Sequence, residues 1–142
     1  MLKILTAITA VLTLTGRDPI YVAELRNQTD ASIEIKVCGP DIYYVNHNNS
    51  GTELSLTDSN GNCKTIKLDK GKIMPIARAS QIAKPITYEN LGFNEIEITT
   101  KNGQIHVTGQ AIMDLFDIEK KTNFIRIHSY DLYYIDIGKK NR

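Results

Sequence analysis

The chain has 142 residues, of which 42% are hydrophobic and 23% charged, and its formal net charge is +1. This length fits one domain with a real hydrophobic core. The near-neutral charge argues against a nucleic-acid partner, because such binding depends on dense positive charge. The basic tail Lys139-Lys140-Asn141-Arg142 is short and terminal, so we interpret it as a solvated end.

Residues 1–16 have the layout of a secretory signal peptide, with Lys3 as the positive charge and Ile4–Leu14 as the apolar stretch. This stretch is too short to cross a bilayer, which takes about 20 residues. Arg17 stands where a bacterial lipoprotein carries its lipid-bearing cysteine. The pattern predicts an exported domain, periplasmic or secreted, over 17–142, with no membrane span or lipid anchor. Alternatively, the apolar stretch is a first strand or a short buried helix of a cytosolic protein.

A period of two dominates the chain from Ala31 onward, where Ile33, Ile35 and Val37 alternate with charged residues. Such alternation is typical of half-buried strands with one apolar face. The pattern predicts a mostly β fold, an antiparallel β-sandwich (Ig-like or related) of about seven to nine strands. Further strands are predicted over Asp41–Asn46, Thr52–Thr57, Cys63–Asp69, Ile73–Arg78, Glu95–Thr100, Gln104–Thr108, Asn123–His128 and Leu132–Ile137.

Two Asn-Gly pairs predict hairpins. Asn102-Gly103 suits a two-residue type I′ loop, which pairs Lys101 with Gln104 and places Ile98 opposite Val107. At Asn60-Gly61 a two-residue loop would mix apolar and polar faces. A three-residue loop, Ser59–Gly61, is therefore predicted there, with Leu54 opposite Ile66 and the apolar residues on one face.

Cys38 and Cys63 both fall on the polar phase of their predicted strands. Two cysteines at strand ends outside the core phase favour a disulfide between neighbouring strands, as suits an exported chain. Such a bond closes a loop of about 25 residues, which stabilises the fold by roughly 3.5 kcal/mol in the chain-entropy model.

One segment departs from the β pattern. Over Gln110–Lys121, Ala111, Ile112, Leu115 and Ile118 recur at three- and four-residue spacing. This spacing predicts a short amphipathic helix. A bulged edge strand is the alternative.

The sequence contains no catalytic, metal-binding or cofactor-binding motif that we can identify. There is no Gly-x-Ser-x-Gly motif and no glycine-rich phosphate loop. His47, His106 and His128 lie on separate predicted elements without metal-ligand spacing. We therefore predict no catalytic residues, no metal and no cofactor. Two N-glycosylation sequons, at Asn27 and Asn48, matter only in a eukaryotic secretory pathway.

The tyrosines are the most suggestive polar residues, since four of the seven form the adjacent pairs Tyr43-Tyr44 and Tyr133-Tyr134. Adjacent residues of a strand face opposite sides, so each pair should place one ring in the core and one outside. The outer rings either pack across strands or form a recognition surface for protein or carbohydrate. All four tyrosines are candidate binding residues.

These patterns favour an exported, non-enzymatic β-sandwich that binds a protein or cell-envelope partner. The bound group is then a protein or a surface carbohydrate. A second hypothesis is a small secreted hydrolase, which predicts a deep pocket lined by at least two of the histidines with acidic neighbours. A third is a structural subunit that assembles through unpaired edge strands. The sequence leaves the oligomeric state open.

Overall fold

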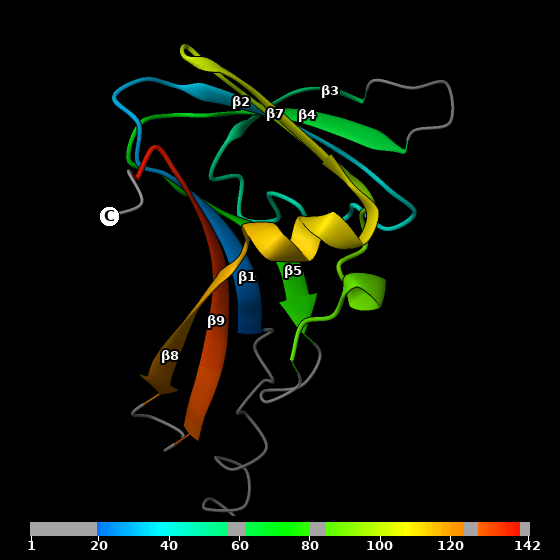
Figure 1. The fold of residues 1–142 in the computed structure, drawn as a ribbon, viewed down its shortest axis with the longest axis vertical. Helices are drawn as coiled ribbons and strands as arrows, with labels where there is room; N and C mark the ends of the chain where they lie inside the picture. Colours follow the sequence, from blue (N-terminus) through cyan, green and yellow to red (C-terminus); the bar gives the residue numbers. More distant parts are fainter. Residues whose placement is uncertain (1–19, 57–61, 80–84, 124–127, 140–142) are drawn as a thin grey trace, which may run out of the picture.

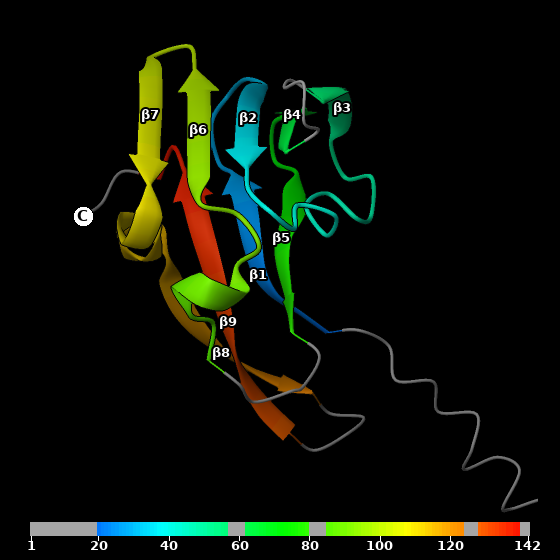
Figure 2. The same cartoon turned by 90° about the vertical axis from the view of Figure 1, so that its right-hand side faces the viewer.

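The structure is a computed structural model that describes residues 20–56, 62–79, 85–123 and 128–139. Over these residues the chain folds into two β-sheets that pack together as a sandwich (Figures 1 and 2). The predicted signal peptide and the alternatives for Ile4–Leu14 lie outside the described residues. No described helix is long and apolar enough to cross a membrane.

One sheet has four strands and the other five. The four-stranded sheet is ordered β5 (Ile73–Ala79), β1 (Ile20–Asn27), β9 (His128–Ile137) and β8 (Asp117–Asn123). The five-stranded sheet is ordered β3 (Thr52–Leu56), β4 (Cys63–Leu68), β2 (Ile33–Cys38), β6 (Glu95–Thr100) and β7 (Gly103–Thr108). The predicted β-sandwich is confirmed; the neighbouring strands pair antiparallel except β1 with β9, which are parallel.

The core lies between the sheets and is built from the alternate residues of each strand. Ile33, Ile35 and Val37 of β2 are at most 2% exposed. Strand β1, which we did not predict, has the same pattern, with Ala23 and Leu25 fully buried. Its alternation extends over few residues, so the period-two signal is weaker there than in β2.

The predicted helix is shorter than its pattern indicated. A 3-10 helix, η2, covers Gly109–Leu115 and buries Ile112 completely. The remainder of the predicted helix belongs to β8, an edge strand on which Ile118 is 59% exposed. This short 3-10 helix already buries Ile112, and the chain then extends to pair with β9.

The Asn102-Gly103 hairpin is confirmed, but its predicted register is wrong. Thr100 pairs with Gly103, so Lys101 and Asn102 form the turn and Ile98 lies opposite Ile105. The Thr100 hydroxyl accepts a hydrogen bond from the Asn102 amide at 3.2 Å and donates one to the Gly103 carbonyl at 3.1 Å. Gly103 has a positive φ of 148°, but it is the first residue of β7 and does not lie in the turn. The shift moves the pairing by two residues, which preserves the two faces.

In the β3–β4 hairpin, a bulge overturns one predicted pairing. Ser55 pairs with Thr65, as the three-residue loop requires, but the register then shifts and Glu53 pairs with Ile66. Leu54 lies in the bulge and is 49% exposed, so its predicted position opposite Ile66 is wrong. The loop itself lies outside the described residues.

The predicted strand Asn123–His128 is also wrong. Asn123 ends β8 and His128 begins β9, and the two residues pair across the antiparallel hairpin. Residues 124–127 lie outside the described part of the chain.

The predicted disulfide between Cys38 and Cys63 is present. The two cysteines are direct cross-strand partners of β2 and β4, with their Cα atoms 4.0 Å apart. Each cysteine is 9% exposed. The bond joins the end of β2 to the start of β4. This is the arrangement that the polar-phase positions of the two cysteines predicted.

At one end of the sandwich Asn27 links several turns. Its side-chain amide donates to the carbonyls of Ala31 and Leu68, at 2.8 and 3.0 Å, and its oxygen accepts from the amide and hydroxyl of Thr29. Asn27 is only 1% exposed. Because both amide hydrogens are engaged inside the fold, its sequon is inaccessible to glycosylation in the folded domain.

Candidate functional site

The chain between β2 and β3 was predicted to contain a strand over Asp41–Asn46, and that prediction is wrong. Residues 43–48 form turns. The Val45 amide bonds the Ile42 carbonyl at 3.1 Å, and Ile42 and Val45 are both buried. Because Ile42 and Val45 both point inward across a turn, the two residues between them, Tyr43 and Tyr44, direct their rings away from the core.

Long-range contacts hold this loop in place. The Asp41 amide bonds the Gly92 carbonyl at 2.9 Å, and the Asn46 amide bonds the Pro75 carbonyl at 2.9 Å. Asn46 adopts a φ of 60° and is 5% exposed, and its side chain makes two hydrogen bonds of 2.8 Å to the backbone of Gly51. The contacts with Gly92 and Pro75 come from residues distant in sequence, so period-two alternation alone could not reveal the turns.

The loop presents a small aromatic cluster formed by Tyr43, Tyr44 and His47. The two tyrosine rings pack edge to face with centroids 5.1 Å apart, and the His47 ring lies 5.8 Å from Tyr43 and 6.1 Å from Tyr44. Tyr43 is 68% exposed and Tyr44 half-buried. Both rings of this pair lie outside the core, in contrast to the predicted arrangement of one inside and one outside.

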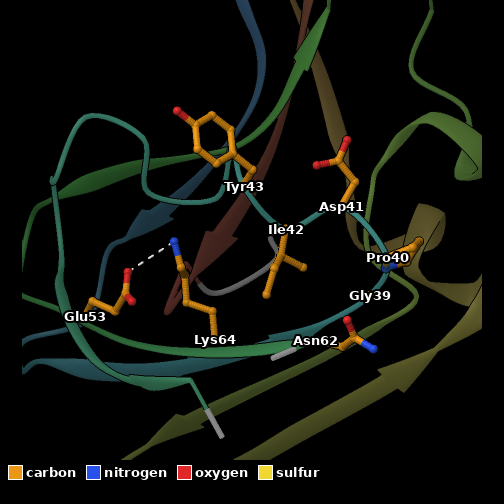
Figure 3. Close-up of a pocket in the computed structure, with 8 residues that line it drawn as sticks. All are labelled: Gly39, Pro40, Asp41, Ile42, Tyr43, Glu53, Asn62 and Lys64. Atoms are coloured by element: carbon orange, nitrogen blue, oxygen red, sulfur yellow. Dashed lines mark ion pairs between the residues drawn. The ribbon is translucent and has the colours of Figure 1, made fainter. Parts of the chain in front are cut away.

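An open pocket of about 330 Å³ lies beside Tyr43. Figure 3 shows Tyr43 and Asp41 on one side of it and Lys64 and Asn62 on the other, with Ile42 between them. Gly39, Pro40 and Glu53 complete its lining. The pocket thus combines an aromatic ring with carboxylate, amide and ammonium groups.

The Lys64 ammonium is the main cation in the pocket wall. Its Nζ lies 3.1 Å from Glu53 Oε2 and donates a hydrogen bond of 3.3 Å to the Val45 carbonyl. The Lys64 side chain is only 16% exposed. The hydrogen bond to Val45 joins strand β4 to the turn that carries the tyrosines. The ion pair with Glu53 partly compensates the positive charge that Lys64 presents to the pocket.

The disulfide lies directly behind this pocket. Gly39 follows Cys38, while Asn62 and Lys64 flank Cys63, and all three neighbours line the pocket. The Gly39 amide also bonds the Asn62 carbonyl at 2.8 Å. The covalent link therefore holds the two halves of the pocket wall together.

The second tyrosine pair lies elsewhere, on β9, and follows the predicted alternation. Tyr133 is 7% exposed and packs edge to face on Phe116, with ring centroids 6.3 Å apart. Tyr134 is half-buried on the outer face, where the Arg26 guanidinium lies 4.1 Å from its ring centroid. The Tyr133 ring is part of the core, so it is not exposed for the predicted contact with a partner.

Arg26 centres a charged network on the outer face of the four-stranded sheet. Its Nε lies 2.7 Å from Glu24 Oε1 and its Nη2 lies 3.3 Å from Glu119 Oε2. Burial opposes the charge on Arg26, but the hydrogen bonds and attraction of Glu24, Glu119 and Asp136 raise the pKa of its guanidinium. One oxygen of Asp136, Oδ1, is buried without a hydrogen-bond partner.

The two histidines whose side chains the structure describes, His47 and His106, do not line the pocket beside Tyr43. His47 packs in the aromatic cluster, and His106 lies on β7 with its Nε2 3.0 Å from Glu95 Oε1. His128 begins β9, and its side chain is not described. Among the described residues, no group of three or more His, Cys, Asp or Glu side chains is placed to hold a metal ion.

No protein-family model matches this chain, and no similar curated protein or solved structure is found. The functional argument therefore depends on the geometry of the chain itself.

Sequence reasoning missed the polar residues of the pocket. Asp41, Glu53 and Lys64 come from three separate segments, and none belongs to a recognisable motif. The one usable signal was the position of Lys64 directly after Cys63. A disulfide between β2 and β4 places the residues on either side of both cysteines close together.

Proposed function

We propose that this domain is a non-enzymatic recognition module that acts outside the cytosol and binds a protein partner through the loop carrying Tyr43. The observation that carries this proposal is the 68% exposed Tyr43 ring beside an open polar pocket. Tyrosine is enriched at protein interfaces because its ring provides rigid contact area and its hydroxyl provides a hydrogen bond.

The loop is held firmly enough to act as a preformed surface. The disulfide, the Asp41–Gly92 hydrogen bond and the double hydrogen bond of Asn46 to Gly51 all fix its path. A preformed surface loses little conformational entropy on binding, which strengthens association. We therefore expect a partner side chain to enter the pocket while the Tyr43 ring packs against neighbouring partner surface.

Export is supported by the disulfide and by the signal-like pattern of residues 1–16. Disulfides persist in oxidising compartments and are rare in the cytosol. N-terminal sequencing of the natural protein tests this part of the proposal. A start near Arg17 supports export, and a start at Met1 contradicts it.

A carbohydrate is the second candidate for the bound group. The pocket favours it through its size and its mixture of carboxylate, amide and ammonium groups around one aromatic ring. Pockets for small ligands start at about 300 Å³, so the volume suits a group of the size of one sugar ring. The hydrolase hypothesis has less support, because the described residues that line the pocket include no histidine, whereas that hypothesis predicts at least two.

The test immobilises the full chain and captures material from an extract of its own source, with the extract divided into untreated, protease-treated and periodate-treated portions. The wild-type protein should capture a partner that protease removes and periodate leaves. Tyr43→Ala should reduce capture at least tenfold, the effect of losing an interface hot spot. Ile118→Ala, at a 59% exposed position on β8, is the matched control and should leave capture unchanged.

The outcomes separate the candidate functions. A partner sensitive to periodate but not to protease replaces the protein partner by a carbohydrate. Equal capture by wild type and Tyr43→Ala contradicts the assignment of this surface.

A further inference from the structure

The four edge strands of the described sandwich differ in how they are protected against pairing with another strand. An edge strand presents unpaired backbone N–H and C=O groups, and proteins block it with bulges, prolines or charged side chains. β3 has a bulge between Glu53 and Ser55, and β5 contains Pro75. β8 carries charged residues at four of its first five positions, DIEKK, and Ile118 is the exception.

β7 has none of these protections. Its sequence, GQIHVT, contains no proline, lysine, arginine or carboxylate, and its six pairs with β6 run without a bulge. Every residue of β7 except Val107 is exposed. Figure 2 shows β7 at one outer edge of the five-stranded sheet, with β3 at the opposite edge. Within the described part of the chain, β7 is thus a regular strand with no strand paired to its outer edge.

We propose that two copies of this chain associate by antiparallel pairing of β7 with β7, about a two-fold axis at His106. The sequence around His106 is self-complementary. The axis places Ile105 opposite Val107 of the second copy, and Gln104 opposite Thr108, and each of these pairings occurs twice. The apolar pairs and the polar pairs keep separate faces, as a stable register requires.

Neighbouring registers are less favourable. A shift by one residue places Ile105 opposite His106 and mixes the two faces. A pairing centred on Ile105 keeps the faces but places Val107 opposite Gly103, which has no side chain to pack. Of these registers, the pairing centred on His106 is the one that packs both apolar side chains of the strand, Ile105 and Val107, against each other across the axis.

The charges next to the axis also suit a second copy. His106 lies 3.0 Å from Glu95 Oε1 and pairs across the sheet with Glu97. Two His106 side chains that meet at the axis are therefore flanked by glutamates from both copies. A positive charge on either imidazole would be compensated within its own chain, so the symmetric pair carries little net repulsion.

Sedimentation velocity of the full chain over a concentration series tests this inference. The wild type should shift from the monomer mass of 16.0 kDa toward twice that mass as concentration rises. Ile105→Lys should remain monomeric, because it places a charge against the apolar side of the second copy. Leu54→Lys and Ile118→Lys make the same change at exposed positions on β3 and β8, and both should associate as the wild type does.

A wild type that stays monomeric, or association that Ile105→Lys leaves intact, overturns the proposal. Because Ile105 is 42% exposed, the variant should still fold, and a circular-dichroism melt confirms this before the comparison. The outcome is independent of the recognition surface at Tyr43, since that surface is tested by capture with a different variant.

Cysteine cross-linking tests the register. His106→Cys places two thiols opposite each other on the axis and should form a covalent dimer in a glutathione redox buffer, detected on a non-reducing gel. Gln104→Cys is the control, because Gln104 faces Thr108 of the second copy and not itself. Cross-linking of Gln104→Cys without cross-linking of His106→Cys contradicts the proposed axis.

Discussion

The same dipeptide, Tyr-Tyr, occurs in two regions of this molecule with opposite consequences. On β9 the extended backbone sends Tyr133 into the core and Tyr134 to the outer face under Arg26. In the turns of residues 43–48, both rings lie outside the core, and Tyr43 is 68% exposed. Backbone conformation thus decides whether a tyrosine stabilises the fold or remains available to a partner.

This comparison separates a structural region from a candidate functional one. The β9 pair is committed to contacts within the chain, with Phe116 on one side and Arg26 on the other. The loop pair is positioned by contacts around it, including the disulfide behind the pocket. Substitutions in the first region should therefore affect stability, and those in the second should affect binding.

Tyr133→Ala should have the largest effect on stability. The substitution removes a buried ring and its contact with Phe116, which costs about 3 to 5 kcal/mol of unfolding free energy for a large aromatic side chain. Urea denaturation followed by circular dichroism measures the loss. A change below about 1 kcal/mol would contradict the core position of Tyr133.

Replacing both cysteines, Cys38→Ser with Cys63→Ser, tests whether the disulfide stabilises the loop with Tyr43 and Tyr44 more than it stabilises β9. The pair closes a loop with a sequence separation of 25, so the double variant should lose about 3.5 kcal/mol of stability. Among molecules that remain folded, we expect faster amide exchange at residues 39–48 and little change on β9. Hydrogen exchange with mass spectrometry, under folding conditions, compares the two segments, and equal acceleration in both would break the distinction.

Tyr134→Ala should cost less than either change, about 1 kcal/mol. The ring is half-buried and its main interaction is the guanidinium of Arg26 above it. Arg26 keeps its ion pairs with Glu24 and Glu119 in this variant. Urea denaturation again provides the measurement, and a loss as large as that of Tyr133→Ala would show that the outer ring is also part of the core.

Glu119→Gln should have the smallest effect, confined to the pH dependence of stability. Hydrogen bonds from Lys121 and Arg26 lower the pKa of the Glu119 carboxyl below its ordinary value of 4.5. A carboxyl whose pKa is lowered by folding stabilises the fold at pH values above the pKa of the unfolded state. This stability is lost as the pH falls through the pKa of the folded state. The variant should lose less stability than the wild type on acidification below about pH 4.5. Urea midpoints at a series of pH values check this, and parallel curves would contradict it.

The sequence alone predicted the sandwich and the disulfide because both follow from local alternation. Ile33, Ile35 and Val37 face the core, while Cys38 and Cys63 lie on the alternate positions of β2 and β4, where the strands pair them. The helix was predicted in the right place but too long, since its spacing also fits the start of an edge strand. Alternation thus identified most strands, although their ends and pairings needed further information.

The candidate site was less predictable because non-local contacts form it. Asn46 anchors the loop to Pro75, and the Asp41 amide bonds Gly92, so a segment with strand-like residues turns instead of extending. Similarly, the bulge that exposes Leu54 leaves no mark in the period-two pattern. The sequence did identify Tyr43 and Tyr44 as candidates, but it could not place them beside Lys64 and Glu53.

The central claim is that the loop pair serves recognition and the β9 pair serves the fold. The most direct test measures partner capture by Tyr43→Ala and Tyr134→Ala, two identical changes in the two pairs, at equal concentrations of folded protein. We predict at least a tenfold loss of capture for Tyr43→Ala and capture near the wild-type level for Tyr134→Ala. Full capture by Tyr43→Ala, or an equal loss in both variants, would contradict the account.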